Sequence, residues 1–258
     1  MLTIWIAIFL GLTQGLTEFL PVSSSGHLML AERFFGIMES SLMFSLILHL
    51  ATLCAVVIVF RKKIWELIKH PLNKTNYNII IATIISCSLV LIFKDYIDRA
   101  FTFYILPFTF LITAIILLIV SFFRTTPNIT KDGTTVTYKT SIFAGIIQGI
   151  AVIPGISRSG ATISAALATG TSREEAAEFS FLMSIPIIVA SFTYELISSP
   201  ESLGSIPFFP MLVAFLTAFV AGIFAIKIML AVVKKIQLYW FSIYLTALSI
   251  LLLIIQFT

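Results

Sequence analysis

Six stretches of this chain are apolar over almost their whole length, and no soluble fold offers a core that could bury them all. They run over Leu42–Phe60, Tyr77–Phe93, Phe103–Phe123, Ala177–Ile197, Phe208–Val233 and Leu238–Phe257. A helix needs about 20 apolar residues to cross a bilayer. Of the 258 residues, 59% are hydrophobic and 11% are charged, whereas a soluble domain carries about 25% charged residues. We therefore predict an all-α membrane protein with a single integral membrane domain over residues 1–258.

Two further segments, Thr3–Phe35 and Thr140–Thr169, are apolar at both ends but are interrupted in the middle by Pro, Gly and Ser. Each half is too short to span a membrane. Interrupted backbone at membrane depth is tolerated only inside the protein or beside a water-filled cavity. We interpret both segments as re-entrant helix–turn–helix hairpins; the alternative is a pair of kinked spans.

The two interrupted segments are copies of one another. A shift of 134 residues aligns Gly11, Gln14, Gly15, Ser23, Ser25 and Gly26 with Gly145, Gln148, Gly149, Ser157, Ser159 and Gly160. Repeat 1 then covers residues 1–123 and repeat 2 covers residues 140–258. A hairpin enters and leaves on one side, and an odd number of spans follows it, so the two repeats are predicted to have inverted topology. Such repeats place a site near the membrane midplane, where they meet.

Most of the 16 Lys and Arg residues fall on one predicted face of the membrane. That face carries Arg61, Lys62, Lys63, Lys69, Lys74, Arg124, Lys131, Lys139, Arg173, Lys227, Lys234 and Lys235, while the other carries Arg33, Lys94 and Arg99. Basic loops mark the cytoplasmic side. We therefore expect both termini and the mouth of the first hairpin on the outer side. The net charge of +4 is small and indicates no nucleic-acid partner.

The first interrupted segment carries a carboxylate followed by hydroxyls and an imidazole. Gln14 and Glu18 are four residues apart and share one helix face, and an ionisable residue at membrane depth is a candidate functional residue. In the run Pro21-Val22-Ser23-Ser24-Ser25-Gly26-His27, Pro21 ends the first half-helix and the serines can cap the second. A helix N-terminus binds phosphate readily, and His27, one turn beyond Ser24, can transfer a proton. For the serines alone, capping without chemistry is an equal alternative.

The second interrupted segment repeats this device as Pro154-Gly155-Ile156-Ser157-Arg158-Ser159-Gly160-Ala161-Thr162, with Arg158 in place of Ser24. A guanidinium presents donors that suit phosphate oxygens. An isolated cation at this depth needs an anion, which is either Glu18 or a substrate phosphate; a purely structural Arg–Glu pair is the alternative. Together the two copies offer a nucleophile, a base and a charge clamp, which predicts a phosphate-processing site.

Other polar residues in the apolar segments have simpler explanations. His49 lies within a predicted span, where it either lines the site or is a satisfied structural histidine, and we favour the structural role. Glu178 is interpreted as a partner of a helix N-terminal dipole. Glu174 and Glu175 follow a Thr-Ser pair that indicates a helix start.

At this point the sequence resembles a known family. The segments QGLTEFLPVSSSGHL and PGISRSGATIS, with the flanking EFSFLMSIP and AIKIML, are similar to the signatures of the undecaprenyl-diphosphate phosphatases, the bacitracin-resistance membrane proteins. The resemblance covers nearly the whole chain. It implies hydrolysis of undecaprenyl (polyprenyl) diphosphate to the monophosphate and phosphate, which recycles the lipid carrier for peptidoglycan and other cell-wall polymers, maintains cell shape and confers bacitracin resistance.

The same resemblance implies an architecture and a setting. The family has two inverted repeats with re-entrant hairpins, forms homodimers, and opens its pocket toward the outer face of the bacterial inner (plasma) membrane.

The resemblance also assigns roles to individual residues. Its acidic motif falls on Gln14 and Glu18, its nucleophile or phosphate-binding hydroxyl on Ser24, its general acid/base on His27, and its phosphate clamp on Arg158. The positions that line its pocket are Ser23, Ser25, Gly26, Ser157, Ser159, Gly160 and Thr162. The first acidic position is often Glu in the family and is Gln14 here. This departure weakens a divalent metal (Mg or Ca) held by two carboxylates and leaves Glu18 as its expected protein ligand.

Two chemical routes and two rival functions stay open. Either Ser24 attacks the terminal phosphorus or a water does, with His27 transferring the proton while Glu18 orients His27, Ser24 or a metal-bound water.

Inverted repeats with broken helices are also typical of transporters, so a lipid or anion transporter is the main rival. A phosphatidic-acid-type phosphatase would need a second catalytic His and a basic upstream motif, and neither is evident in the sequence.

Overall fold

A computed structural model describes residues 2–37, 42–122, 134–200, 206–235 and 238–257, and all secondary structure within these ranges is helical. Six helices there are long and apolar enough to cross a membrane, which confirms the predicted all-α membrane protein. They are α3 (Leu42–Val59), α5 (Lys74–Ile92), α7 (Leu106–Ser121, extended at its start by a 3₁₀ turn, Phe103–Ile105), α10 (Arg173–Ser198), α12 (Phe208–Lys235) and α13 (Tyr239–Phe257). Their bounds follow the predicted spans closely, except that the predicted end of the third span, Phe123, lies outside the described residues.

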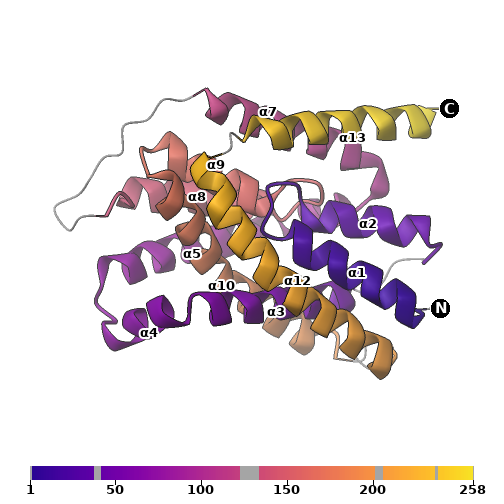
Figure 1. Ribbon diagram of the computed structural model, residues 1–258, viewed down its shortest axis with the longest axis horizontal. Coiled ribbons are helices and arrows are strands. Elements are labelled where there is room, and N and C mark those ends of the chain that lie inside the picture. The colour runs from indigo at the N-terminus through magenta and orange to yellow at the C-terminus, as the bar shows by residue number, and fades with distance from the viewer. Residues whose placement is uncertain (1, 38–41, 123–133, 201–205, 236–237, 258) are drawn as a thin grey trace.

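The two interrupted segments form pairs of short helices joined by a turn. The first pair is α1 (Ile4–Thr17) and α2 (Ser24–Phe34), and the second is α8 (Tyr138–Ile150) and α9 (Arg158–Ala168). The members of each pair pack against each other, and Figure 1 shows α2 running back beside α1. The predicted serine caps are confirmed, because Ser23 accepts from the Gly26 N–H and Ser157 accepts from the Gly160 N–H.

Helix contacts follow a reciprocal pattern between the two halves of the chain. Helix α1 packs on α12 and α8 packs on α5; likewise α3 packs on α12 and α10 packs on α5. Two further pairs, α3 with α10 and α7 with α13, join elements at the same position in each half, and Figure 1 shows α7 and α13 side by side.

Small residues allow the close approach at both hairpin contacts. Gly11 and Gly15 of α1 lie against the backbone of Ala214 and Ala218 in α12, and Gly145 of α8 lies against Ala82 in α5. Small residues at such spacing let apolar helices come together without a hydrophobic driving force. The hairpins are therefore held by tight packing against a span of the other half.

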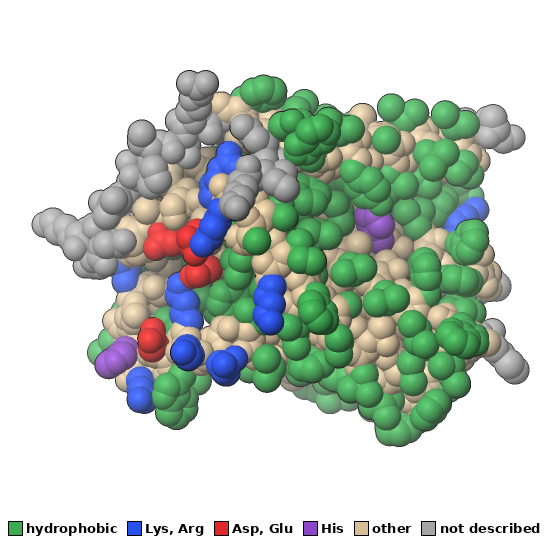
Figure 2. Space-filling view, in the orientation of Figure 1, with side chains coloured by type: hydrophobic (Ala, Val, Ile, Leu, Met, Phe, Trp, Pro, Cys, Tyr) green, Lys and Arg blue, Asp and Glu red, His purple; other side chains and the backbone are tan. Residues whose placement is uncertain are grey.

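Charged side chains gather toward one end of the molecule, on the left of Figure 2, while apolar side chains cover the right of this face. Two short helices, α4 (Arg61–Lys69) and α6 (Lys94–Arg99), follow α3 and α5. Lys63 of α4 pairs with Glu178 of α10, and Lys234 pairs with Glu174. Glu178 thus has a specific cation as its partner, beyond the helix dipole that was predicted for it. Two residues of the predicted basic face, Arg124 and Lys131, lie outside the described residues.

The helix start predicted at Glu174 and Glu175 is confirmed. Helix α10 begins at Arg173, and its N-cap Ser172 accepts a hydrogen bond from the Glu175 N–H.

Candidate active site

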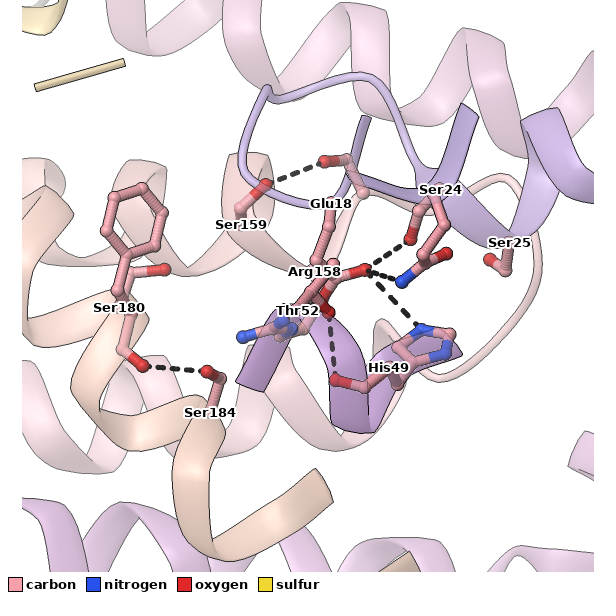
Figure 3. Close-up of polar contacts among 12 residues, drawn as sticks. Glu18, Ser24, Ser25, His49, Thr52, Arg158, Ser159, Ser180 and Ser184 are labelled. Atoms are coloured by element: carbon pink, nitrogen blue, oxygen red, sulfur yellow. Dashed lines mark hydrogen bonds and ion pairs between the residues drawn. The ribbon is translucent and has the colours of Figure 1, made fainter. Parts of the chain in front are cut away.

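Glu18, at the end of α1, is the centre of a polar cluster in the interior of the protein. Its side chain is 3% exposed. Its Oε1 accepts a hydrogen bond from Arg158, and its Oε2 accepts from Ser24 Oγ at 2.5 Å and from Gln14 Nε2 at 3.0 Å. His49 Nε2 lies 3.4 Å from the same Oε2. A buried carboxylate is stable only with such partners, and Figure 3 shows them converging on it.

The partners of Glu18 come from four helices. Gln14 lies one turn before Glu18 on α1, Ser24 begins α2, Arg158 begins α9, and His49 lies on α3. The two signature motifs, 134 residues apart in sequence, therefore meet at their turns. Glu18 was expected to orient His27, Ser24 or a metal-bound water, and in the structure it contacts Ser24.

Backbone and hydroxyl contacts lock the two turns together. The Gly155 N–H donates to Ser23 Oγ at 3.1 Å, and Ser159 Oγ donates to the Leu20 carbonyl at 3.1 Å. Gly155 has φ +88°, and an added Cβ there would lie 1.9 Å from Thr109 Oγ1. Only glycine both adopts this positive φ without strain and leaves room for Thr109. The turn therefore lies directly against α7.

One terminal nitrogen of the Arg158 guanidinium has no hydrogen-bond partner among the described residues. This nitrogen, Nη1, is buried, whereas the other, Nη2, donates to Glu18. A buried, unpartnered donor on a charged group is costly, and an anionic oxygen is the acceptor that satisfies it best. Gln14 Oε1 is likewise buried without a partner in the part of the chain that the structure describes.

His27 lies apart from the Glu18 cluster. Its Nδ1 is 2.8 Å from the Ser23 carbonyl oxygen, and its Nε2 is 2.7 Å from the hydroxyl of Tyr244 in α13. Within the described ranges both ring nitrogens are thus occupied, and neither contacts Ser24 or Glu18. The two motifs therefore supply Glu18, Ser24 and Arg158 to one cluster, while His27 faces a residue that the motifs do not contain.

The other predicted lining residues mostly bind one another or the backbone. Ser25 Oγ is 3.4 Å from Ser23 Oγ, and Ser157 Oγ is 3.4 Å from Ser159 Oγ. Thr162 Oγ1 donates to the Arg158 carbonyl at 2.8 Å.

The two predicted glycines of the motifs are packing positions in this structure. A Cβ at Gly26 would lie 2.6 Å from the ring of Phe110, and one at Gly160 would lie 3.0 Å from Pro21 Cβ. Both glycines therefore bring neighbouring elements close together.

Three residues at or next to the cluster were not predicted as site residues. His49 contacts Glu18, which favours the alternative that it lines the site over the structural role we preferred. Tyr244 contacts His27, and Ser180 lies 2.6 Å from Thr162 Oγ1. A histidine within an apolar span was a usable signal in the sequence. Ser180 lies in the flanking segment EFSFLMSIP, which was also a usable signal. Tyr244 carries no local signal, because only packing brings it to His27.

The groups around Glu18 do not fit a divalent cation held by the protein alone. Mg²⁺ and Ca²⁺ prefer several oxygen ligands, and no group of three or more His, Cys, Asp or Glu side chains comes together among the described residues. The neighbours of Glu18 are instead hydrogen-bond donors, with the Arg158 cation in direct contact. The expected metal ligand Glu18 is therefore already neutralised by Arg158.

Comparisons with known proteins identify the family of this chain. Residues 7–251 match the family model of the bacitracin resistance protein BacA. A protein of Carboxydothermus hydrogenoformans named undecaprenyl-diphosphatase is 42% identical over 97% of this chain and 96% of its own length. Proteins of the same name from Treponema denticola and Christiangramia forsetii are 39% and 40% identical, over 96% and 92% of both chains. The chain therefore belongs to the bacitracin resistance protein BacA family.

Proposed function

We propose that this protein hydrolyses undecaprenyl diphosphate, or a related polyprenyl diphosphate, to the monophosphate and inorganic phosphate. The observation that carries the proposal is Arg158, at the start of α9 beside the Ser24–Glu18 pair, whose buried Nη1 has no hydrogen-bond partner among the described residues. Helix N-termini and a guanidinium bind phosphate oxygens. Family membership and the names of the relatives support the same reaction, whose role is to recycle the carrier lipid for cell-wall synthesis and to confer bacitracin resistance.

The contacts favour Glu18 as the group that activates Ser24. In the covalent route, Ser24 Oγ attacks the terminal phosphorus and its proton passes to Glu18 Oε2, 2.5 Å away. The bond between that phosphorus and the bridging oxygen breaks, and the polyprenyl monophosphate leaves with the electron pair. Water then hydrolyses the phosphoserine and restores Ser24. In the direct route, water attacks while Ser24 and Arg158 hold the phosphate, and His27 exchanges the proton.

Phosphate release by purified protein in detergent tests the reaction. We expect release from a polyprenyl diphosphate by the wild type and its loss in Arg158→Ala. Acid quenching during turnover would trap a phosphoserine at Ser24 on the covalent route, whereas full turnover by Ser24→Ala would eliminate that route. If the purified wild type released no phosphate in detergent, as expected of a transporter, that result would contradict the proposed function. The transporter alternative finds no support among the relatives, which are named as diphosphatases.

A divalent cation is proposed as an aid to substrate binding. Since Glu18 is already paired with Arg158, a Mg²⁺ or Ca²⁺ ion would be held mainly by the diphosphate oxygens, where it would neutralise their charge. A chelator is expected to slow phosphate release, and readdition of the cation to restore it. Full activity after exhaustive chelation would contradict a cation requirement.

We also propose that residues 1–123 and 140–258 are inverted repeats, each a re-entrant hairpin followed by three spans. The reciprocal contacts support this, because α1 on α12 and α8 on α5 are the same contact with the halves exchanged. The short lengths of α1, α2, α8 and α9 also support hairpins that turn back within the membrane.

The protein is further proposed to lie in the bacterial inner membrane as a homodimer, with both termini and the site's opening on the outer side. The grouping of basic residues supports the orientation, and the dimer is inferred from family resemblance. A C-terminal fusion to alkaline phosphatase, which is active only outside, tests the orientation. Native mass spectrometry in detergent tests the dimer.

A further inference from the structure

His27 is held by one hydrogen bond at each ring nitrogen, and the chemistry of the partners determines where its proton lies. The Ser23 carbonyl oxygen, 2.8 Å from Nδ1, can only accept a hydrogen bond. Nδ1 therefore carries the proton in the neutral ring, and Nε2 presents its lone pair. The Tyr244 hydroxyl, 2.7 Å from Nε2, must then be the donor in that bond. The single basic nitrogen of His27 is thus occupied by a phenol from the last helix of the chain.

The Nδ1 side of this arrangement is rigid. Ser23 is the only residue other than glycine in the described ranges with positive φ, at 69°, and its hydroxyl accepts from the N–H groups of Gly155 and Gly26. A non-glycine residue in this region is strained and persists only where its surroundings hold it there. The junction of the two hairpins therefore orients the Ser23 carbonyl that anchors His27.

The Nε2 side is held by a residue that the surrounding protein only partly encloses. Tyr244 is 46% exposed and stacks on the His27 ring at a centroid distance of 5.8 Å and an interplanar angle of 16°. From α7, Phe110 meets the ring edge-on at 5.4 Å. Among the described residues, no charged side chain forms an ion pair with His27. The groups that face the ring are the backbone of Val22 and Ser23 just before its own helix, the phenol from α13 and the Phe110 ring from α7.

We propose that Tyr244 is a positioning residue for His27 that occupies Nε2 in the free enzyme and yields it when the diphosphate binds. This inference rests on the direct route of the proposed function, in which water attacks the phosphorus and His27 exchanges the proton. Nε2 is the only nitrogen available for that exchange, because Nδ1 remains bound to Ser23. The phenol keeps its own proton throughout. It donates to the neutral ring, and its oxygen accepts from Nε2–H when the free enzyme is protonated.

The pH profiles of Tyr244→Phe test this role. The profile of kcat/KM reports the free enzyme, whereas that of kcat reports the substrate complex. Losing the phenol removes a charge-assisted acceptor from protonated His27 in the free enzyme. We therefore expect the His27 limb of kcat/KM to move to lower pH by about half a unit to one unit. The limb of kcat should stay in place, because Tyr244 has already left Nε2 in the complex.

The matched control is Tyr239→Phe, which removes a hydroxyl from the same helix at a residue whose ring lies 4.8 Å from that of Trp240, tilted by 33°. It should move neither limb. Unchanged limbs in Tyr244→Phe would overturn the inference, even if its rate fell, and equal movement of both limbs would show that Tyr244 remains on His27 in the complex.

A measurement without turnover separates this inference from the proposed function. The chain has three histidines, so ¹⁵N-histidine NMR can follow His27, assigned with His27→Gln. We expect the Nε2 signal to change between wild type and Tyr244→Phe in the free protein, and this difference to vanish with a non-hydrolysable methylene diphosphonate of farnesol. A wild type without phosphatase activity contradicts the function, whereas identical Nε2 signals in the two free proteins contradict the Tyr244 contact.

Discussion

At the scale of single residues, the site is organised around one buried charge. Glu18 accepts hydrogen bonds on both carboxylate oxygens, from Arg158 on one side and from Ser24 and Gln14 on the other. Removing one member of a buried ion pair costs about 3–5 kcal/mol, because the remaining charge has no partner. Loss of stability and loss of chemistry must therefore be separated in any experiment on this pair.

A double replacement makes that separation. Arg158→Met alone is expected to lower both the melting temperature in detergent and phosphate release. Glu18→Gln combined with Arg158→Met removes both charges, so the melting temperature should recover most of its loss while phosphate release stays at least a hundredfold below wild type, or about 2.7 kcal/mol. Activity that recovers together with stability would show that the pair is purely structural.

His49 carries the second residue-scale prediction. Its Nδ1 donates to the Ser45 carbonyl at 2.8 Å, which leaves Nε2 directed at Glu18. The two atoms, His49 Nε2 and Glu18 Oε2, lie 3.4 Å apart. His49→Leu removes this contact, and we expect phosphate release to fall about tenfold, the size of effect typical of one polar contact to a charged group.

His49→Gln retains an amide donor and should keep more activity than His49→Leu in the same phosphate-release assay. His70→Gln is the control, because His70 is exposed at the end of α4. Equal activity of wild type and His49→Leu would contradict a role for His49 at the site.

At the scale of elements, the hairpins depend on close helix packing. A Cβ at Gly15 would lie 2.6 Å from both the Ala218 carbonyl oxygen and Ala221 Cβ in α12. Overpacking of this kind costs about 1–3 kcal/mol. Gly15→Ala is therefore expected to lower the melting temperature in detergent and to reduce activity by displacing Glu18, one turn further along α1.

Gly36→Asn is the control for Gly15→Ala. Gly36 has φ +62° and no atom within 4 Å of an added Cβ, and Asn tolerates this conformation. Gly36→Asn should leave the melting temperature near that of the wild type. A Gly15→Ala protein as stable as the wild type would contradict the tight α1–α12 contact.

Helix α4 has the character of a helix that lies on a membrane surface. It exposes Trp65 and Ile68 beside the basic residues Arg61, Lys62 and Lys69. Basic residues near an anionic membrane surface each contribute about 1 kcal/mol of attraction. In a protein whose only tryptophan is Trp65, brominated lipids should quench its fluorescence, and Lys62→Gln with Lys69→Gln should weaken quenching by brominated anionic lipids. Absence of quenching by any brominated lipid would place α4 away from the bilayer.

At the scale of the whole molecule, labelling of single cysteines distinguishes re-entrant hairpins from kinked spans. Ile4 and Phe34 are exposed at the two ends of the first hairpin, and Lys139 and Ala168 at those of the second. In inverted re-entrant repeats, cysteines at Ile4 and Phe34 react with an impermeant maleimide from outside the cell, whereas cysteines at Lys139 and Ala168 react only after permeabilisation. Reaction of Ile4 and Phe34 from opposite sides would instead show a pair of spans.

The sequence by itself determined the elements of this protein. The positions of the six long apolar helices, the interruptions at Pro21 and Pro154 and the caps at Ser23 and Ser157 were all predictable. These features depend on hydrophobic length and on backbone hydrogen bonding within a few residues. The place of Arg158 in an apolar segment further predicted an anionic partner, either Glu18 or a substrate phosphate, and in the structure Glu18 pairs with it.

Only the tertiary structure decided which side chains meet. It turned His27 toward Tyr244, 217 residues away, and brought His49 to Glu18, which Ser24 contacts as well. No local pattern encodes these pairs, because they arise from how the helices pack and from the need of each buried polar group for a partner. The sequence therefore predicted the chemistry that the site could contain, and the packing of the helices determined how that chemistry is arranged.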